Sequence, residues 1–599
     1  MTRFCSIIDV LLSRSAETPE RPGYSFIRRD GSPVSLTYGE LANSVRDVAA
    51  TLIGDATRNA RAILMYPNSV ELVVAMYGCM AAGFVPVPVY PLVKAKVKRG
   101  IHQLLRVIAD AQCGLILTNR ALASDLHRTL VDSTKTVRIL TTDDIPTGCG
   151  KDFEPVLCVP ESLALLQYTS GSTALPRGVR ISHGNLIANS MAIRDTFSCS
   201  PDTGAVSWLP PYHDMGLIGG IFQPLFAGFQ MTFMSPFAFV QDPIRWLRAI
   251  SETKATISPS PNFGYELCTQ RVPPEAMADL DLSHWSIAIC GAEPVRASTL
   301  QRFAHKFAPA GFRMQAFRPS YGLAEATLLV AATSSGGLPA WHAFDREALE
   351  SGLAIPSADA GTSRVLVGNG RPVLGVTAKI VNPATFHMCP DGSVGEVWVA
   401  GAGVSEGYWD KGTSEESIFR AQTAGSEDSC YLRTGDLGFI HNGELFITGR
   451  LKDLIIIRGR NHHAEDLEQL VRASHESLKD MLNAVFSMAI EEEEMLVVLQ
   501  EVPRSVLESK VDLEELISAV NQALAEESLR PDAVVLLKPG SIPRTSSGKV
   551  QRYASRNDFM GRHLAACAQW TTARFREAIV HFNSILQVPR RSDGTDSEL

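Results

Sequence analysis

The sequence has no Cys-x-x-Cys pair and no other close grouping of cysteines. Its 11 cysteines, an odd number, are scattered from Cys5 to Cys567, most of them in apolar surroundings such as AMYGCMAAG. Cysteines in this pattern are typical of small core residues in a reducing compartment. They therefore predict a cytoplasmic protein.

The sequence also lacks an excess of basic residues and a long apolar run. Lys and Arg number 56 against 64 Asp and Glu, which gives a formal net charge of -8. Because binding a nucleic-acid backbone requires a basic face, we expect no nucleic-acid partner. No apolar segment reaches the length of a membrane span, and Asp9 interrupts the short N-terminal apolar patch, which no secretory cleavage site follows. We therefore expect neither a transmembrane segment nor a secretory signal.

The composition is that of a globular enzyme, with 45% hydrophobic and 20% charged residues. A chain of 599 residues is too long for one core and suggests roughly two to four units. Apolar runs alternate with helical patterns through the first half, from RAILMY (61–66) through GIHQLLRVIADAQ (100–112) to GLILT (114–118). This alternation predicts an α/β fold, with βα-layered sheets in a large N-terminal domain.

The pattern changes from about Val365, where short strands alternate with Gly-rich turns, as in SVGEVWVAG (393–401). These predict a small β subdomain. Beyond it, alternating strand and helix patterns predict a compact α+β unit of about 100 residues, connected through Leu451 to Asp453. The predicted domains are therefore residues 1–451, residues 452–560, and a tail over 561–599 whose polar end is predicted to be disordered.

The stretch YTSGSTALPRGV, from Tyr168 to Val179, carries the features of a phosphate-binding loop. Glycine lets the backbone approach an anion, hydroxyl groups donate hydrogen bonds to it, and a basic residue screens its charge. The residues concerned are Thr169, Ser170, Gly171, Ser172, Thr173 and Arg177. The stretch predicts a nucleotide substrate, although a Ser/Thr/Gly cluster between strands is ordinarily a plain turn.

A second loop, PSYGLAEATL (319–328), also suits a nucleotide. Tyr321 can stack on a purine, Gly322 permits unusual backbone geometry, and the Glu325 carboxylate can hold a Mg²⁺ that bridges phosphates. A third block, CGAEPV (290–295), is a polar break after an apolar strand and contains Gly291 and Ala292.

Three further blocks each present one charged side chain. In YLRTGDLG, Asp436 can accept hydrogen bonds from both ribose hydroxyls; FITGRLKDLIIIRG adds Arg450; and SIPRTSSGKVQR carries Lys549 on a turn. The alternatives are a turn or cap residue for Asp436, an ion-pair partner for Arg450 and a solvated surface lysine for Lys549. The occurrence of all six blocks together favours the nucleotide-binding interpretation.

In this order the six blocks resemble those of the adenylate-forming superfamily of acyl-CoA synthetases, peptide-synthetase adenylation domains and luciferases. The resemblance extends from about Thr37 to Arg552, and within the superfamily the chain looks most like the fatty acyl-AMP ligases. The segments that carry this closer match are VPVPVYP (85–91), LQYTSGST (166–173), WLPPYHDMGLIGG (208–220), SPSPNFGYELC (258–268), FDREALESGLAIPSA (344–358) and GRNHHAEDLE (459–468).

The resemblance implies that the protein uses ATP and Mg²⁺. In the first step a fatty carboxylate attacks the α-phosphorus of ATP and gives acyl-AMP and pyrophosphate. Glu325 would hold the metal, the loop from Thr169 to Thr173 would hold the pyrophosphate part, and Lys549 would bridge the two reacting groups.

The resemblance also implies roles around the adenylate. Tyr321 would lie on the adenine with Gly291 and Ala292 along its edge, while Asp436 and Arg450 would hold the ribose. His213 would lie beside the acyl carboxylate, or else be a hydrogen-bonded buried histidine.

In the implied second step, the C-terminal domain acts as a mobile lid that turns about Lys452 or Asp453 and removes Lys549. The acyl group then passes to the phosphopantetheine thiol of an acyl carrier protein. The family's preference for a carrier over CoA is associated with an extra segment, which FDREALESGLAIPSA would match, although a plain surface insertion looks similar. No phosphopantetheine-site pattern follows Arg552, so we expect the carrier to be a separate protein.

Two positions depart from the family's usual SGSTGxPKG pattern, because Ala174 replaces a glycine and Arg177 a lysine. Alanine is harder to accommodate at positive φ, and arginine is a planar fork rather than a point donor. Because of these departures, a non-catalytic adenylate or acyl sensor is one alternative function. A fatty acyl-CoA ligase with the same first step is another.

Selection of the acyl chain is expected to fall to apolar residues after the His213 motif, since each buried CH₂ contributes about 0.8 kcal/mol. Plain core packing is the alternative for most of them. The candidates are Ile221, Phe222, Met231 and Phe263.

Overall fold

A computed structural model describes residues 4–578, except for residues 29, 54–59, 93–96, 131–136, 170–175, 360, 411–414, 426–429, 458–459, 491–492, 509–511, 527–528, 546–547 and 562. The chain forms two compact units. The first consists of Met1–Thr169, Leu175–Arg346 and Ala354–Ile447, and the second includes Glu347–Leu353 and the chain from Thr448 onward.

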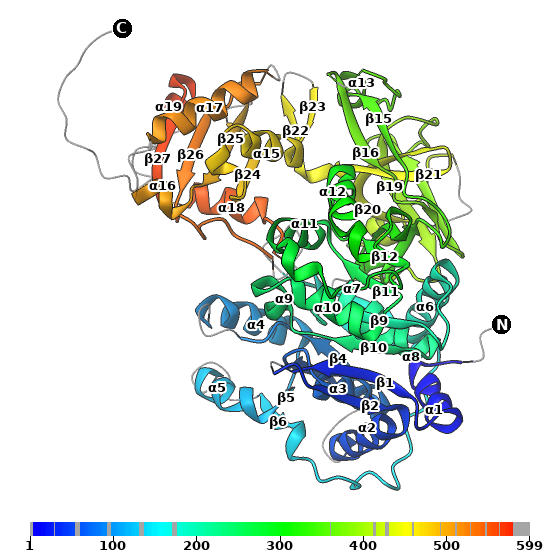
Figure 1. Ribbon diagram of the computed structural model, residues 1–599. Helices are drawn as coiled ribbons and strands as arrows, with labels where there is room; N and C mark the ends of the chain where they lie inside the picture. The colour runs from blue at the N-terminus through cyan, green and yellow to red at the C-terminus, as the bar shows by residue number, and fades with distance from the viewer. Residues whose placement is uncertain are drawn as a thin grey trace. The chain divides into compact units, whose positions relative to one another are not determined.

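The first unit is built on a nine-stranded sheet in the order β17-β14-β13-β12-β11-β9-β10-β1-β2. Figure 1 labels six of these strands, from β12 to β2 in that order. The six strands from β13 to β1 run parallel, and the remaining strands are antiparallel to their neighbours. Their bounds are β1 (Pro22–Ile27), β2 (Pro33–Thr37), β9 (Gly204–Ser207), β10 (Gln230–Phe233), β11 (Ile257–Ser260), β12 (Ile287–Cys290), β13 (Phe317–Gly322), β14 (Leu329–Ala332) and β17 (Arg371–Pro372). Since parallel strands end at one edge, the blocks that follow β12 and β13 lie side by side.

A second, all-parallel sheet in the same unit confirms the predicted βα rhythm. Its order is β4 (Val85–Pro88), β3 (Arg61–Met65), β5 (Leu115–Thr118) and β6 (Arg138–Thr141), with α3 (Val70–Ala81) between β3 and β4, and α4 (Val97–Ala111) between β4 and β5. Proline cannot donate to a strand ladder, so Pro86 and Pro88 are tolerated because β4 is the edge strand.

An antiparallel sheet of β18 (Val376–Val381), β19 (Gly395–Gly401), β20 (Leu432–His441) and β21 (Glu444–Arg450) forms the small β subdomain predicted from about Val365. Beside it in the sequence, β15 (Trp341–Asp345) and β16 (Ser363–Val367) form a hairpin. The loop after β19 and the strand β20 both carry residues of the candidate site.

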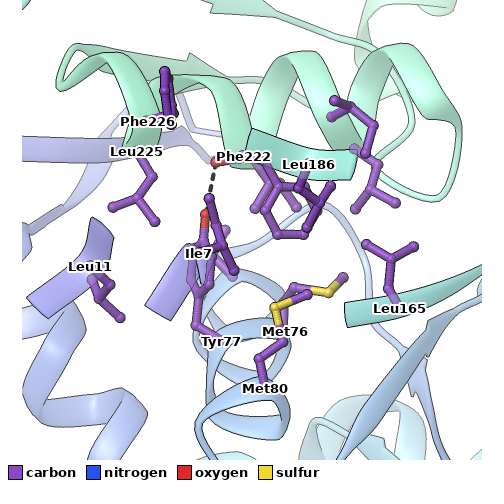
Figure 2. Packing of buried hydrophobic residues seen from close by; sticks show 14 of the residues in the cluster. Ile7, Leu11, Met76, Tyr77, Met80, Leu165, Leu186, Phe222, Leu225 and Phe226 are labelled. Carbon is purple, nitrogen blue, oxygen red and sulfur yellow. Dashed lines mark hydrogen bonds between the residues drawn. The ribbon is translucent and has the colours of Figure 1, made fainter. Parts of the chain in front are cut away.

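The largest apolar core of the first unit joins elements that are far apart in the sequence. Figure 2 shows Ile7 and Leu11 of α1 (Ile7–Glu17) and Met76 and Tyr77 of α3 packed near Phe222. Helix α1 can dock there because its N-terminus is closed by a capping box, in which the side chains of Ser6 and Asp9 each accept a hydrogen bond from the other's backbone N–H.

The second unit contains a four-stranded sheet in the order β24 (Asn483–Ile490), β25 (Glu493–Glu501), β26 (Ala533–Leu537) and β27 (Ala566–Thr571). Helices α15 (Ala464–Ala473) and α17 (Leu513–Glu526) supply apolar residues to its core, and α18 (Arg552–Met560) contributes Phe559 to a second cluster. The short hairpin of β22 (Leu454–Ile457) and β23 (Arg460–His463) precedes them.

The end of this unit corrects the predicted tail at 561–599. β27 pairs with β26, and α19 (Ala573–Ala578) follows with Phe575 fully buried. The polar composition of the last residues concealed the apolar side chains that precede them. Residues 579–599 lie outside the described part of the chain.

Across the described residues, no helix combines the length and the apolar character needed to cross a membrane.

Candidate active site

Tyr321 and Asp436, predicted to contact the adenine and the ribose of one nucleotide, are in direct contact. The hydroxyl of Tyr321 on β13 donates a hydrogen bond to Oδ2 of Asp436 on β20 at 2.7 Å. Both residues are more than nine-tenths buried. The Thr434 hydroxyl accepts from the Asp436 N–H at 3.1 Å and so holds the turn that carries the carboxylate.

Gly291 and Ala292 follow β12, next to Tyr321. Cys290 is paired with Pro319 in the parallel ladder, and a Cβ on Gly291 would lie 2.8 Å from the carbonyl oxygen of Ser320. Glycine therefore lets the two strand ends approach closely. Ala292 has a φ of +64°, a left-handed conformation that is uncommon for a residue other than glycine.

Glu325 lies four residues beyond Tyr321, on the short helix η7 (Ala324–Ala326). The next residue but one, Thr327, is fully buried with φ +67° and ψ -58°, and its hydroxyl donates to the carbonyl of Gly403 at 2.6 Å. The Leu328 N–H bonds to the Ala326 carbonyl across Thr327, which makes a strained γ-turn. These two hydrogen bonds fix the backbone on the C-terminal side of Glu325.

Asn189 of α6 (His183–Phe197) holds the backbone just after the same turn. Its side chain donates to the carbonyl of Leu329 at 3.0 Å and accepts from the Leu329 N–H at 3.1 Å. Because Asn189 is buried, this amide is a fixed anchor for the segment that bears Glu325.

The carboxylate of Glu325 is held by a residue that the sequence did not single out. The Tyr408 hydroxyl donates to Glu325 Oε1 at 2.7 Å, and the Arg177 guanidinium lies over the Tyr408 ring, 5.2 Å from its centroid. Arg177 also lies 4.0 Å from the Glu415 carboxylate. Arg177 and Glu325, predicted to contact phosphate and metal, thus share one aromatic neighbour. Tyr408 is 83 residues from Glu325, and no local pattern could reveal the pairing.

The chemistry of these groups fits a magnesium ion bound together with a nucleotide. Mg²⁺ in phosphoryl-transfer sites is commonly held by one or two carboxylates plus substrate phosphates, so a single protein carboxylate is sufficient. Within the described residues no group of three or more His, Cys, Asp or Glu side chains forms a metal cage. Oε2 of Glu325 has no partner among those residues.

His213 is half-buried immediately before the helical turn α7 (Asp214–Leu217), with its ring 5.4 Å from that of Tyr212. Its carbonyl accepts from the Leu217 N–H, which starts the turn. A role beside the acyl carboxylate stays a prediction.

The four predicted acyl-pocket residues lie in two apolar clusters. Ile221, Phe222 and Met231 belong to the largest core, where the hydroxyls of Tyr24 and Tyr77 both donate to the Ile221 carbonyl. Phe263 packs edge-on against Trp208 in a separate cluster. These contacts are those of core packing, and a role in acyl binding stays a prediction.

The remaining predicted residues belong to the second unit. Arg450 ends β21, and Lys452 and Asp453 form the short helix η9 (Leu451–Asp453). Lys549 is exposed at the end of a tight turn, in which its carbonyl accepts from the Thr545 N–H at 2.7 Å and its N–H donates to the Thr545 hydroxyl at 3.0 Å. The predicted phosphate-loop residues Ser170, Gly171, Ser172, Thr173 and the departure at Ala174 lie outside the described residues.

The segment 344–358, matched to the family's extra segment, contributes α13 (Arg346–Glu350). Within the second unit, the Glu350 carbonyl accepts from the Asn461 side chain at 3.1 Å, and its carboxylate lies 3.4 Å from His462 and 3.9 Å from Arg460. These contacts join it to the segment GRNHHAEDLE.

The chain is similar over most of its length to proteins that are already known. Residues 12–409 match the family described as AMP-binding enzyme, and residues 452–569 match the AMP domain described as Disco-interacting protein 2-like. The chain is 41% identical over 565 residues to the medium-chain-fatty-acid–[acyl-carrier-protein] ligase JamA of Moorena producens, covering 93% of this chain and 95% of that protein. It is 35% identical over 571 residues to the long-chain-fatty-acid–AMP ligase FadD26 of Mycobacterium marinum, covering 92% and 96%.

Among solved structures, the chain is similar to the fatty acyl-adenylate ligase of Legionella pneumophila in complex with acyl adenylate and pyrophosphate. The identity is 34%, the TM-score is 0.73, and the match covers 95% of this chain and 98% of that one. The comparison confirms the predicted α/β fold.

Proposed function

Because the chain belongs to the family of AMP-binding enzymes and is a ligase of the acyl-adenylate-forming kind, we propose that it activates a fatty acid with ATP and loads it onto an acyl carrier protein. The observation that carries this proposal is the buried hydrogen bond between Tyr321 and Asp436. It brings together, from strands 115 residues apart, an aromatic ring for a purine and a carboxylate for a ribose. Glu325 follows Tyr321 on the same loop.

The first step has to bring a carboxylate to a triphosphate although both are negatively charged. Arg177 and Lys549 would supply positive charge, since a positioned cation stabilises the charge that moves onto the leaving pyrophosphate. A Mg²⁺ held by Glu325 would neutralise phosphate oxygens when bound. Asp436 and Arg450 would orient the ribose, so that the α-phosphorus faces the incoming carboxylate.

In the second step, the acceptor thiol attacks the carbonyl carbon of the mixed anhydride. The thiol releases its proton to solvent, the new C–S bond replaces the bond to the phosphate oxygen, and AMP leaves as an anion. We propose that the thiol belongs to an acyl carrier protein, the acceptor that JamA is named for, and that this carrier is a separate chain. A turn about Lys452 or Asp453 would carry Lys549 out of the first-step position. The cytoplasm is the proposed location, consistent with 11 cysteines that form no disulfide among the described residues.

The test is a two-stage assay with the full chain. Saturated acids of increasing length are supplied with ATP and Mg²⁺, and pyrophosphate release and acyl-AMP are measured. CoA or a holo carrier protein is then added. We expect acyl-AMP with every accepted acid, and acyl transfer to the carrier but not to CoA. Abundant acyl-CoA would replace the carrier assignment with a CoA ligase, whereas the absence of acid-dependent pyrophosphate release would leave a non-catalytic sensor.

A Lys549→Ala variant sharpens the first stage. We expect a loss of about 100-fold or more in acyl-AMP formation, because the variant removes charge stabilisation of the transition state. Nucleotide binding is expected to stay within a few-fold of the parent. Unchanged turnover would show that Lys549 is only a surface residue.

A further inference from the structure

The hydroxyl of Tyr408 forms a hydrogen bond with Glu325, the carboxylate that we propose as the magnesium ligand. It lies in the loop between β19 and α14 (Glu416–Phe419), and its hydroxyl donates to Glu325 Oε1 at 2.7 Å. The geometry points to Tyr408 as a positioning residue, which orients Glu325 so that Oε2 is presented to the metal. This inference rests on the proposed function, since it concerns the metal used with ATP.

The backbone on either side of Tyr408 is fixed to β8 (Arg177–Ser182). Tyr408 forms an antiparallel bridge with Val179, and the Trp409 N–H donates to the Gly178 carbonyl at 2.7 Å. Ser405, three residues earlier, donates its N–H to the Glu325 carbonyl at 2.8 Å. Backbone hydrogen bonds therefore connect the chain around Tyr408 both to β8 and to the segment that carries Glu325. These bonds fix the position of the Tyr408 hydroxyl relative to the Glu325 carboxylate.

The ring of Tyr408 also packs against two side chains. Phe419 meets it edge-on with ring centroids 5.0 Å apart, and Arg177 lies over it. A cation over an aromatic face is attracted to it, so the ring steadies Arg177 as well. Burial and the neighbouring Glu325 carboxylate raise the pKa of the Tyr408 hydroxyl well above its ordinary value, in keeping with its place as the donor of this hydrogen bond.

Occupation of one carboxylate oxygen by a hydroxyl donor has a consequence for magnesium. Mg²⁺ requires nearly ideal octahedral geometry, so a carboxylate that rotates freely is a poorer ligand than one whose direction is set. Residues that hydrogen-bond a metal ligand typically change metal affinity 10- to 100-fold when they are removed. We therefore expect Tyr408 to affect the metal requirement and to leave the adenosine contacts alone.

The test compares Tyr408→Phe with the parent by calorimetric titration of α,β-methylene-ATP at several Mg²⁺ concentrations, with no fatty acid present. Phenylalanine keeps the ring against Phe419 and Arg177 and removes only the hydroxyl. We expect the half-saturating Mg²⁺ concentration to rise 10- to 100-fold, with metal-free nucleotide binding within two-fold of the parent. Tyr431→Phe, a tyrosine of the same unit that packs near Trp398, is the matched control and is expected to change neither value.

Glu325→Gln and the double variant complete the experiment. If Tyr408 acts through Glu325, the double variant has the same metal requirement as Glu325→Gln alone. An unchanged metal requirement in Tyr408→Phe, an equal loss of metal-free nucleotide binding, or additive losses in the double variant would each overturn the inference. Because the titration needs no turnover, these results are distinct from a failure of acyl-AMP formation, which would count against the proposed function.

Discussion

The buried guanidinium of Arg552 offers a sharp test of how the second unit is held together. Its Nε and Nη2 bind the two oxygens of Glu468 at 2.7 and 2.8 Å, and its Nη1 binds Asp453 Oδ2 at 2.9 Å. The Arg552 side chain is 13% exposed and that of Glu468 6%. Arg552→Ala would therefore leave a carboxylate buried without its cation.

Breaking one side of such a buried pair typically costs about 3 to 5 kcal/mol. Asp453 is 23% exposed and can be solvated after the change, so most of the penalty falls on Glu468. We expect Arg552→Ala to lower the opening free energy of the second unit by about 3 kcal/mol. Lys479→Ala, which removes an exposed ion pair with Glu476 in the same unit, is the control and is expected to cost at most about 1 kcal/mol.

The penalty should depend on pH in a defined direction. Burial raises the pKa of the Glu468 carboxyl, and Arg552 opposes that shift. Without Arg552 the pKa of Glu468 rises further in the folded state, so the folded variant binds a proton more readily than the unfolded chain. The difference between variant and parent is therefore largest near neutral pH and shrinks as the pH falls through the raised pKa.

Native-state hydrogen exchange is the suitable assay, because a chain of two units does not unfold in a single step. Exchange is followed by mass spectrometry in peptides from β25 and β26, at pH 7 and at a lower pH after correction for intrinsic rates. A loss no larger than that of Lys479→Ala, or a loss that grows on acidification, would refute the reasoning.

Two further predictions concern the first unit. Burial lowers the pKa of His183 to about 4, and its Nδ1 accepts from the Ile7 N–H at 3.3 Å. The neutral form is therefore favoured by folding, and stability is lost as the pH falls from the ordinary value near 6.5 toward 4, by about 3 kcal/mol in all. His183→Gln keeps an acceptor, so the opening free energy measured by native-state hydrogen exchange in peptides from α1 and α6 should lose this part of the pH dependence. A decline parallel to that of the parent would contradict the assignment. For Gly322→Ala, the added Cβ would lie 1.9 Å from the Leu328 carbonyl oxygen. We expect weaker ATP-analogue binding by 10-fold or more together with a lower melting temperature, while Gly336→Ala, at an open turn position, is expected to leave binding unchanged. Equal binding in the two variants would show that the backbone at Leu328 can move away from the new Cβ without disturbing the site.

Much of the fold followed from local patterns in the chain. The βα alternation between residues 61 and 118 predicted βα-layered sheets, and the short strands after Val365 predicted a β subdomain. These patterns succeed because side-chain periodicity reflects which face of an element is buried. The end of the second unit was missed, because β27 is recognisable as a strand only through its pairing with β26.

The sequence by itself determined which chemical groups are available and in what order: an aromatic ring and a carboxylate at Tyr321 and Glu325, another carboxylate at Asp436, and a lysine on a Gly-containing turn. Only the tertiary structure decided which of these groups touch. The pairing of Tyr321 with Asp436 and of Tyr408 with Glu325 arises from strand order and loop packing across 115 and 83 residues. Side-chain chemistry is a property of each residue, whereas proximity is a property of the whole fold, and long-range hydrogen bonds leave no periodic trace in the chain.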